Sequence, residues 1–91
     1  IGAILLSPGL DYRGIKTAPL ITGLLKNQKV FLVASKDDSE SYTAITTLNN
    51  LNTKSSNILK LEMGGHGTDM LKNYAELENK IYSWVKSLYN I

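Results

Sequence analysis

The polar segment 64–69 contains the only histidine of the chain, His66, and glycines at positions 64, 65 and 67. Glycine lets the backbone turn sharply and leaves a neighbouring ring uncrowded. A strand-like run precedes this segment and a helix-like run follows it, and functional side chains gather where such strands end. This context favours an acid–base role for His66 over the role of an ordinary surface or packing histidine.

Asp38 is the residue that we expect to act together with His66. It follows an earlier strand-like run, and a carboxylate beside an imidazole can hold the ring in one tautomer and stabilise its protonated form. Asp is also a favoured helix N-cap, although Asp37 or Ser39 could fill that position instead. Asp11, in a turn after the first apolar run, and Asp37 are the alternative acids. We rank Asp38 above Asp11, and Asp37 below both.

No nucleophile is recognisable in the sequence. An exposed serine on a strand-to-helix turn needs a small residue on each side, as in G-x-S-x-G. Ser7 ends a strand-like run but precedes Pro8, and Ser35 is followed by Lys36. The chain has no cysteine, which excludes a cysteine nucleophile and a thiolate metal site. A single histidine leaves too few good ligands for zinc, so we expect neither a metal nor a cofactor.

Length and composition predict one small folded domain. The chain has 91 residues, of which 43% are hydrophobic and 20% are charged, as is ordinary for a globular protein. The net charge is +2, and the basic residues are scattered, so nothing suggests a partner nucleic acid. No stretch reaches the roughly 20 apolar residues that a membrane span needs. The cellular location is not indicated.

Three strand-like runs alternate with three helix-like ones. Strands are expected at 3–6, 30–34 and 58–63, and helices at 17–25, from position 38 or 39 to 51, and at 74–89, with a helical turn from Thr68 or Asp69. This order predicts an α/β fold in three layers, with a parallel sheet and right-handed crossovers. The loops 7–15, 35–39 and 64–69 would then meet at one rim, so Asp11, Asp38 and His66 can approach one another.

The first expected strand lacks a neighbour. The third expected strand suits a sheet edge, because the charged residues Lys60 and Glu62 alternate with apolar residues as far as Met63. The run from Ala3 to Leu6 is too apolar for an edge. We therefore expect further strands beside it, from a preceding part of the polypeptide or from another chain, and we expect the 91 residues to self-associate through this strand.

The chain resembles about the C-terminal third of an α/β-hydrolase. The similarity, to bacterial esterase-like and dienelactone-hydrolase-like members, covers nearly the whole chain. It rests on the strand and loop 4–14 (ILLSPGLDYRG), on the strand and acid 30–38 (VFLVASKDD), and on Gly65-His66-Gly67 before a helix that contains Trp84. The resemblance implies the last three strand–helix units of that fold, with Asp38 as the acid and His66 as the base. The serine nucleophile and the oxyanion-hole donors would precede Ile1.

The resemblance implies a serine hydrolase that cleaves an ester or related acyl bond of a small molecule. Residues 1–91 would be the C-terminal portion of its domain and inactive alone, with the N-terminal portion as their partner. Tyr12 and Arg13 are candidates for the wall of the substrate pocket, although ordinary loop roles are equally compatible. Two alternatives stay open: a self-contained α/β binding or assembly module, in which the His66 loop binds an anion, and a hydrolase-fold protein without catalysis.

Overall fold

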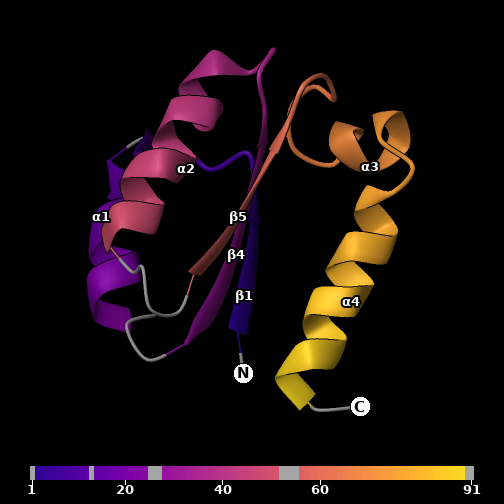
Figure 1. The fold of residues 1–91 in the computed structure, drawn as a ribbon. Coiled ribbons are helices and arrows are strands. Elements are labelled where there is room, and N and C mark those ends of the chain that lie inside the picture. The colour runs from indigo at the N-terminus through magenta and orange to yellow at the C-terminus, as the bar shows by residue number, and fades with distance from the viewer. Residues whose placement is uncertain (1, 13, 25–27, 52–55, 90–91) are drawn as a thin grey trace.

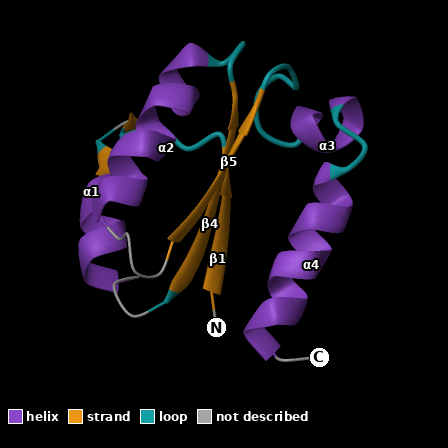
Figure 2. Cartoon of the chain, viewed as in Figure 1, coloured by secondary structure: helices purple, strands orange, loops and turns teal. Residues whose placement is uncertain are grey.

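A computed structural model describes residues 2–12, 14–24, 28–51 and 56–89. Its centre is a parallel sheet of β1 (Gly2–Leu6), β4 (Lys29–Ser35) and β5 (Ser56–Leu61), in the order β1-β4-β5. Helix α2 (Ser39–Leu51) covers one face, and α4 (Leu77–Tyr89) covers the other (Figures 1 and 2). The predicted α/β class and parallel sheet are confirmed.

The central strand β4 divides the interior into two cores. Its side chains alternate between the faces of the sheet, as in any strand, and residues 30–35 are all buried. One core, on the α2 face, consists of Ile21, Val30, Leu32, Ala34, Ile45 and Leu48. The other, on the α4 face, consists of Phe31, Val33, Leu61, Met70 and Leu77. The uninterrupted apolar run in β4 is therefore explained by burial on both faces.

The segment between β1 and β4 departs from the expected loop and helix. It forms a small antiparallel hairpin of β2 (Asp11–Tyr12) and β3 (Ile15–Lys16). A single α-helical turn, α1 (Thr17–Pro19), and a π-helical turn, η1 (Leu20–Leu24), follow it. The helix is short, as its sequence suggests, and the last residue of the predicted range 17–25 lies outside the described residues.

Strand β5 lies two residues earlier in the sequence than the expected strand 58–63. β5 ends at Leu61, and a bend at 62–63 leads into the histidine loop. Met63, expected to be buried at the strand's end, is 70% exposed because it lies beyond the last strand pairing. The alternation itself holds within the strand, since Leu61 is buried and Lys60 is exposed. The sequence pattern therefore predicts the correct face, but both ends of the strand lie two residues earlier than expected.

The last helical region is also divided. A short helix α3 (Asp69–Asn73) follows the histidine loop, and α4 begins at Leu77 rather than at 74. The interruption is a turn, in which the Tyr74 N–H donates to the Met70 carbonyl and the Leu77 N–H donates to the Tyr74 carbonyl. Within the described residues, no helix is long and apolar enough to cross a membrane.

Strand β1 lies at one edge of the sheet. Its five residues pair with β4 from Gly2↔Lys29 to Leu6↔Val33, and each is half-buried. No other strand of the described segments pairs with its second side. An apolar strand therefore lies at an edge, where parallel sheets normally carry more polar residues or a cover.

Candidate active site

Three loops meet where the parallel strands end, at the upper end of the sheet in Figure 1. Backbone hydrogen bonds attach the first residue of two of these loops to the neighbouring strand: the Ser7 N–H donates to the Val33 carbonyl of β4 at 2.8 Å, and the Lys36 N–H donates to the Leu61 carbonyl of β5 at 2.8 Å. The sheet therefore fixes where these two loops begin. This rim is the place where ligands bind in open parallel sheets.

The side chains of His66 and Asp38 meet at this rim. The distance from His66 Nδ1 to Asp38 Oδ2 is 2.5 Å, a close hydrogen-bonding contact. The His66 side chain is 71% exposed and the Asp38 side chain only 18%. With Asp38 ionised, Nδ1 is the donor, and Nε2 of the neutral ring is left as an acceptor on an exposed imidazole. This arrangement can accept a proton from a group that arrives from solvent.

Asp38 is also the N-terminal cap of α2. Its N–H donates to the Ser35 carbonyl at 3.0 Å, and its carbonyl accepts the Tyr42 N–H at 2.9 Å. The two roles considered for this residue are therefore compatible, because the backbone starts the helix while the side chain meets His66. A helix N-terminus also favours a negative charge.

The electrostatic surroundings keep Asp38 ionised at neutral pH. Burial raises the pKa of its carboxyl group. Hydrogen bonds from His66, Ser41 and Ser7, and the charge of His66, outweigh burial and hold the pKa below its ordinary value of 3.8. The carboxylate is therefore available to orient and stabilise the imidazole ring.

The two glycines that flank His66 are hydrogen-bonded to side chains from other loops of the rim. The Gly65 N–H donates to both carboxylate oxygens of Asp37 at 3.2 Å, and the Gly67 N–H donates to Ser7 Oγ at 2.7 Å. Both glycines have positive φ, +83° and +60°, which side chains disfavour. The glycines thus allow the tight path of the loop, and the hydrogen bonds hold it in place.

Neither alternative acid is hydrogen-bonded to the imidazole among the described residues. Asp11 is exposed, and its Oδ1 accepts the Gly14 N–H at 2.9 Å within the β2–β3 hairpin, which is an ordinary turn role. Asp37 holds the backbone of the histidine loop rather than the ring. The side chain of Tyr12 and the whole of Arg13, considered for the substrate pocket, lie outside what the structure describes.

Two serines at the rim matter in ways that sequence reasoning missed. Ser7 and Ser35 were weighed only as nucleophiles, and both are buried, at 6% and 0% exposure. Ser7 contacts the histidine loop, whereas Ser35 Oγ has no hydrogen-bond partner among the described residues. The available signal was their position, because each directly follows an apolar run in the sequence that leads to the rim. No three His, Cys, Asp or Glu side chains of the described segments are grouped closely enough to hold a metal ion.

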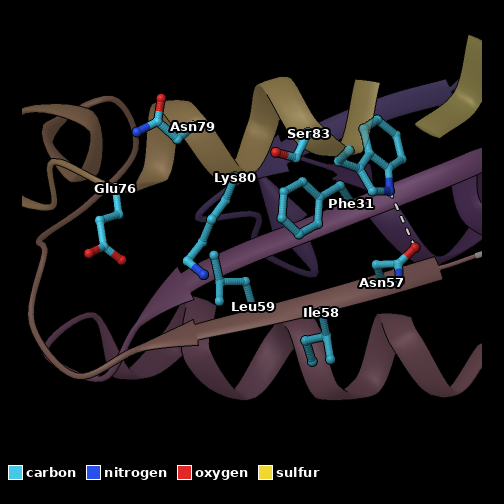
Figure 3. A pocket seen from close by; sticks show the side chains of 9 residues that line it. Phe31, Asn57, Ile58, Leu59, Glu76, Asn79, Lys80 and Ser83 are labelled. Atoms are coloured by element: carbon cyan, nitrogen blue, oxygen red, sulfur yellow. Dashed lines mark hydrogen bonds between the residues drawn. The ribbon is translucent and has the colours of Figure 1, made fainter. Parts of the chain in front are cut away.

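A groove of about 630 Å³ between α4 and β5 lies apart from this site (Figure 3). Lys80 reaches from α4 toward Leu59 on β5. Phe31 and Trp84 also line the groove, and their stacked rings have centroids 5.4 Å apart. The remaining lining residues are Asn57, Ile58, Glu76, Asn79 and Ser83. The lining of the groove includes neither His66 nor Asp38, so the groove is separate from the candidate site.

Comparison with models of protein families, with curated proteins and with solved structures gives no match for this chain. The arrangement of side chains at the rim is therefore the observation that bears on function.

Proposed function

We propose that this chain carries the base and the acid of a serine hydrolase that cleaves an ester or related acyl bond. The observation that carries the proposal is the 2.5 Å contact between His66 Nδ1 and Asp38 Oδ2, with the imidazole largely exposed. A base that acts on an incoming substrate needs one ring nitrogen oriented by a carboxylate and the other open to the reacting group. The resemblance to the C-terminal part of α/β-hydrolases supports the same assignment.

In this proposal, His66 moves one proton in each half of the reaction. Nε2 removes the proton of a serine hydroxyl as its oxygen bonds to the acyl carbon, and the imidazolium then gives that proton to the departing alcohol. Water repeats the sequence and releases the acid and the free serine. Asp38 stays ionised throughout and stabilises the imidazolium on Nδ1.

The nucleophile is proposed to come from polypeptide outside these 91 residues. The Ser7 and Ser35 hydroxyls are buried, and Asp38 is the sole side chain of the described residues that is hydrogen-bonded to the His66 ring. The apolar outer edge of β1 supports an adjoining part of the domain, because an uncovered edge of this kind is an association hazard. The carboxyl ends of adjoining parallel strands would reach the same rim.

The geometry supports an anion-binding module less well. The helix after the histidine loop, α3, has only five residues and begins with Asp69. A short helix has a weak dipole, and an acidic side chain at its first residue opposes an incoming anion.

The test is labelling of the native-length protein with a fluorophosphonate probe, followed by intact mass. We expect a single adduct on a serine, and we expect His66→Ala to slow labelling by about 10²- to 10⁴-fold, the usual effect of losing a general base. Asp38→Asn is expected to slow labelling as well. Asp11→Asn is the matched control and should leave the rate unchanged, because Asp11 only stabilises a hairpin turn.

Two results would contradict the proposal. One is unchanged labelling of a folded His66→Ala protein. The other is stoichiometric esterase turnover by residues 1–91 alone, which would show that the nucleophile lies within them.

A further inference from the structure

Ser7 occupies an unusual place at the rim. It directly follows β1, is 6% exposed, and has a positive φ of 53°. A residue with a side chain is strained in this left-handed region, and such strain is kept where the surroundings hold it in place. The close contacts of its hydroxyl group supply that hold.

The Ser7 hydroxyl contacts the histidine loop beside the acid–base pair. Its oxygen accepts the Gly67 N–H at 2.7 Å, one residue after the histidine. The hydroxyl also lies 3.9 Å from the Met70 thioether, which is a weak acceptor, and donation from it is one cause of the low pKa of Asp38. One side-chain atom therefore holds the backbone of the histidine loop beside the acid.

We propose that Ser7 is a positioning residue of the acid–base pair: its hydroxyl holds the backbone of the histidine loop at Gly67, so that the His66 ring stays oriented toward Asp38 for proton transfer. This proposal rests on the proposed function. Glycines on both sides of the histidine leave the loop backbone free to move, and a hydrogen bond at Gly67 restrains it beside the ring.

The same contacts argue against Ser7 as the nucleophile. A nucleophilic hydroxyl donates to the imidazole and is open to substrate. The Ser7 hydroxyl instead accepts from the Gly67 backbone, donates toward a carboxylate, and is buried.

The first test uses Ser7→Ala in the 91-residue chain, with NMR titration of the Asp38 carboxyl carbon and hydrogen exchange of the Gly67 amide. We expect the pKa of Asp38 to rise, because one hydrogen bond that lowers it is lost. We expect Gly67 exchange to accelerate by about 2- to 10-fold, as for loss of one ordinary hydrogen bond. The Nδ1 proton signal of His66 should broaden or move, which a purely structural role would not require.

Ser41→Ala is the matched control. Ser41 also hydrogen-bonds to Asp38, so its loss should raise the pKa of that carboxyl but leave Gly67 exchange unchanged. Ser7→Gly is the second variant, because it removes the hydroxyl while relieving the strain of the positive φ. It should reproduce both effects of Ser7→Ala even if the alanine variant folds poorly.

The second test measures hydrolysis or probe labelling by the native-length protein. Ser7→Gly should lower kcat by about 10-fold or more with little change in KM, because misorientation of a catalytic group affects the reacting state. Unchanged Gly67 exchange, unchanged kcat, or a fluorophosphonate adduct on Ser7 itself would each overturn the positioning role. The His66→Ala variant distinguishes failure of the proposed function from failure of the positioning role. If His66 is not the base, this variant keeps its reactivity toward the probe, whatever the effect of the Ser7 substitutions.

Discussion

Replacement of Asp38 by Asn tests the central contact of the site. Asn has nearly the same size and is an equally good helix N-cap, so the start of α2 should survive. The substitution removes the negative charge and places an amide group where a carboxylate accepted hydrogen bonds from His66, Ser41 and Ser7. The effect on the free energy of unfolding therefore reports on these hydrogen bonds rather than on the helix.

The expected loss of stability is about 2 kcal/mol. A hydrogen bond to a charged group contributes about 1.5–3 kcal/mol when it is shielded from water. The His66 side chain is 71% exposed, so its share is limited to the roughly 0.2–1 kcal/mol of a solvent-exposed ion pair. The Ser7 and Ser41 side chains are buried, and an amide oxygen is a weaker acceptor than a carboxylate, so each of their two bonds loses about 0.5–1 kcal/mol.

Urea unfolding at neutral pH, followed by fluorescence of the single tryptophan, Trp84, measures this loss. Asp37→Asn is the matched control. Asp37 is exposed and accepts a single backbone N–H at 3.2 Å, so its replacement should cost no more than about 0.5 kcal/mol. His66→Ala should cost no more than about 1 kcal/mol.

The pH dependence gives a second, independent check. The pKa of Asp38 in the folded chain lies below its ordinary value of 3.8. The stabilisation is therefore fully present above that ordinary value and is lost as the pH falls through the folded pKa. The difference in stability between the wild-type chain and Asp38→Asn should narrow as the pH falls through the folded pKa of Asp38. Equal losses of stability for Asp37→Asn and Asp38→Asn would refute the reasoning. So would a difference in stability that does not change with pH.

Three further predictions follow from packing. Gly64→Ala should lower stability by about 1–3 kcal/mol, because a Cβ there would lie 2.6 Å from Ser35 Oγ. Gly23→Ala is the control, since Gly23 has open space around it. It should raise stability by up to about 1 kcal/mol in the same denaturant assay. Trp84→Ala should cost about 2–3 kcal/mol through loss of its half-buried ring, whereas Tyr82→Ala, 65% exposed, should stay within about 0.5 kcal/mol in thermal unfolding. Sedimentation of the 91-residue chain should show self-association through β1, and a monomer at all concentrations with β1 ordered would contradict it.

The sequence was most informative where burial is uniform. The apolar run of β4 predicts a strand buried on both faces, and every residue from Val30 to Ser35 is buried. The sequence was least informative at the ends of the strands. The hairpin strands Asp11–Tyr12 and Ile15–Lys16 are two residues each, too short to show a period of two. β5 starts at polar Ser56 because backbone pairing with β4, rather than side-chain type, sets the beginning of an edge strand.

The candidate site was predictable in part for a topological reason. The strand order brings the residues after each strand to one rim, which is how Asp38 and His66 come together across 28 positions of sequence. The role of Ser7 was not predictable in this way. Its partner Gly67 lies 60 residues away, and a backbone N–H is the same at every position, so no residue type in the sequence marks this contact.

Hydrogen bonds from two other loops hold the glycine-rich histidine loop in place. Three glycines in four residues increase the conformational freedom that folding must remove. Successive contacts oppose this freedom at Gly65, His66 and Gly67, through side chains from the loops after β4 and β1. Because the anchors come from separate loops, loss of one leaves the loop attached but lets the ring turn. Single substitutions at the anchors should therefore disturb proton transfer more than they disturb the fold.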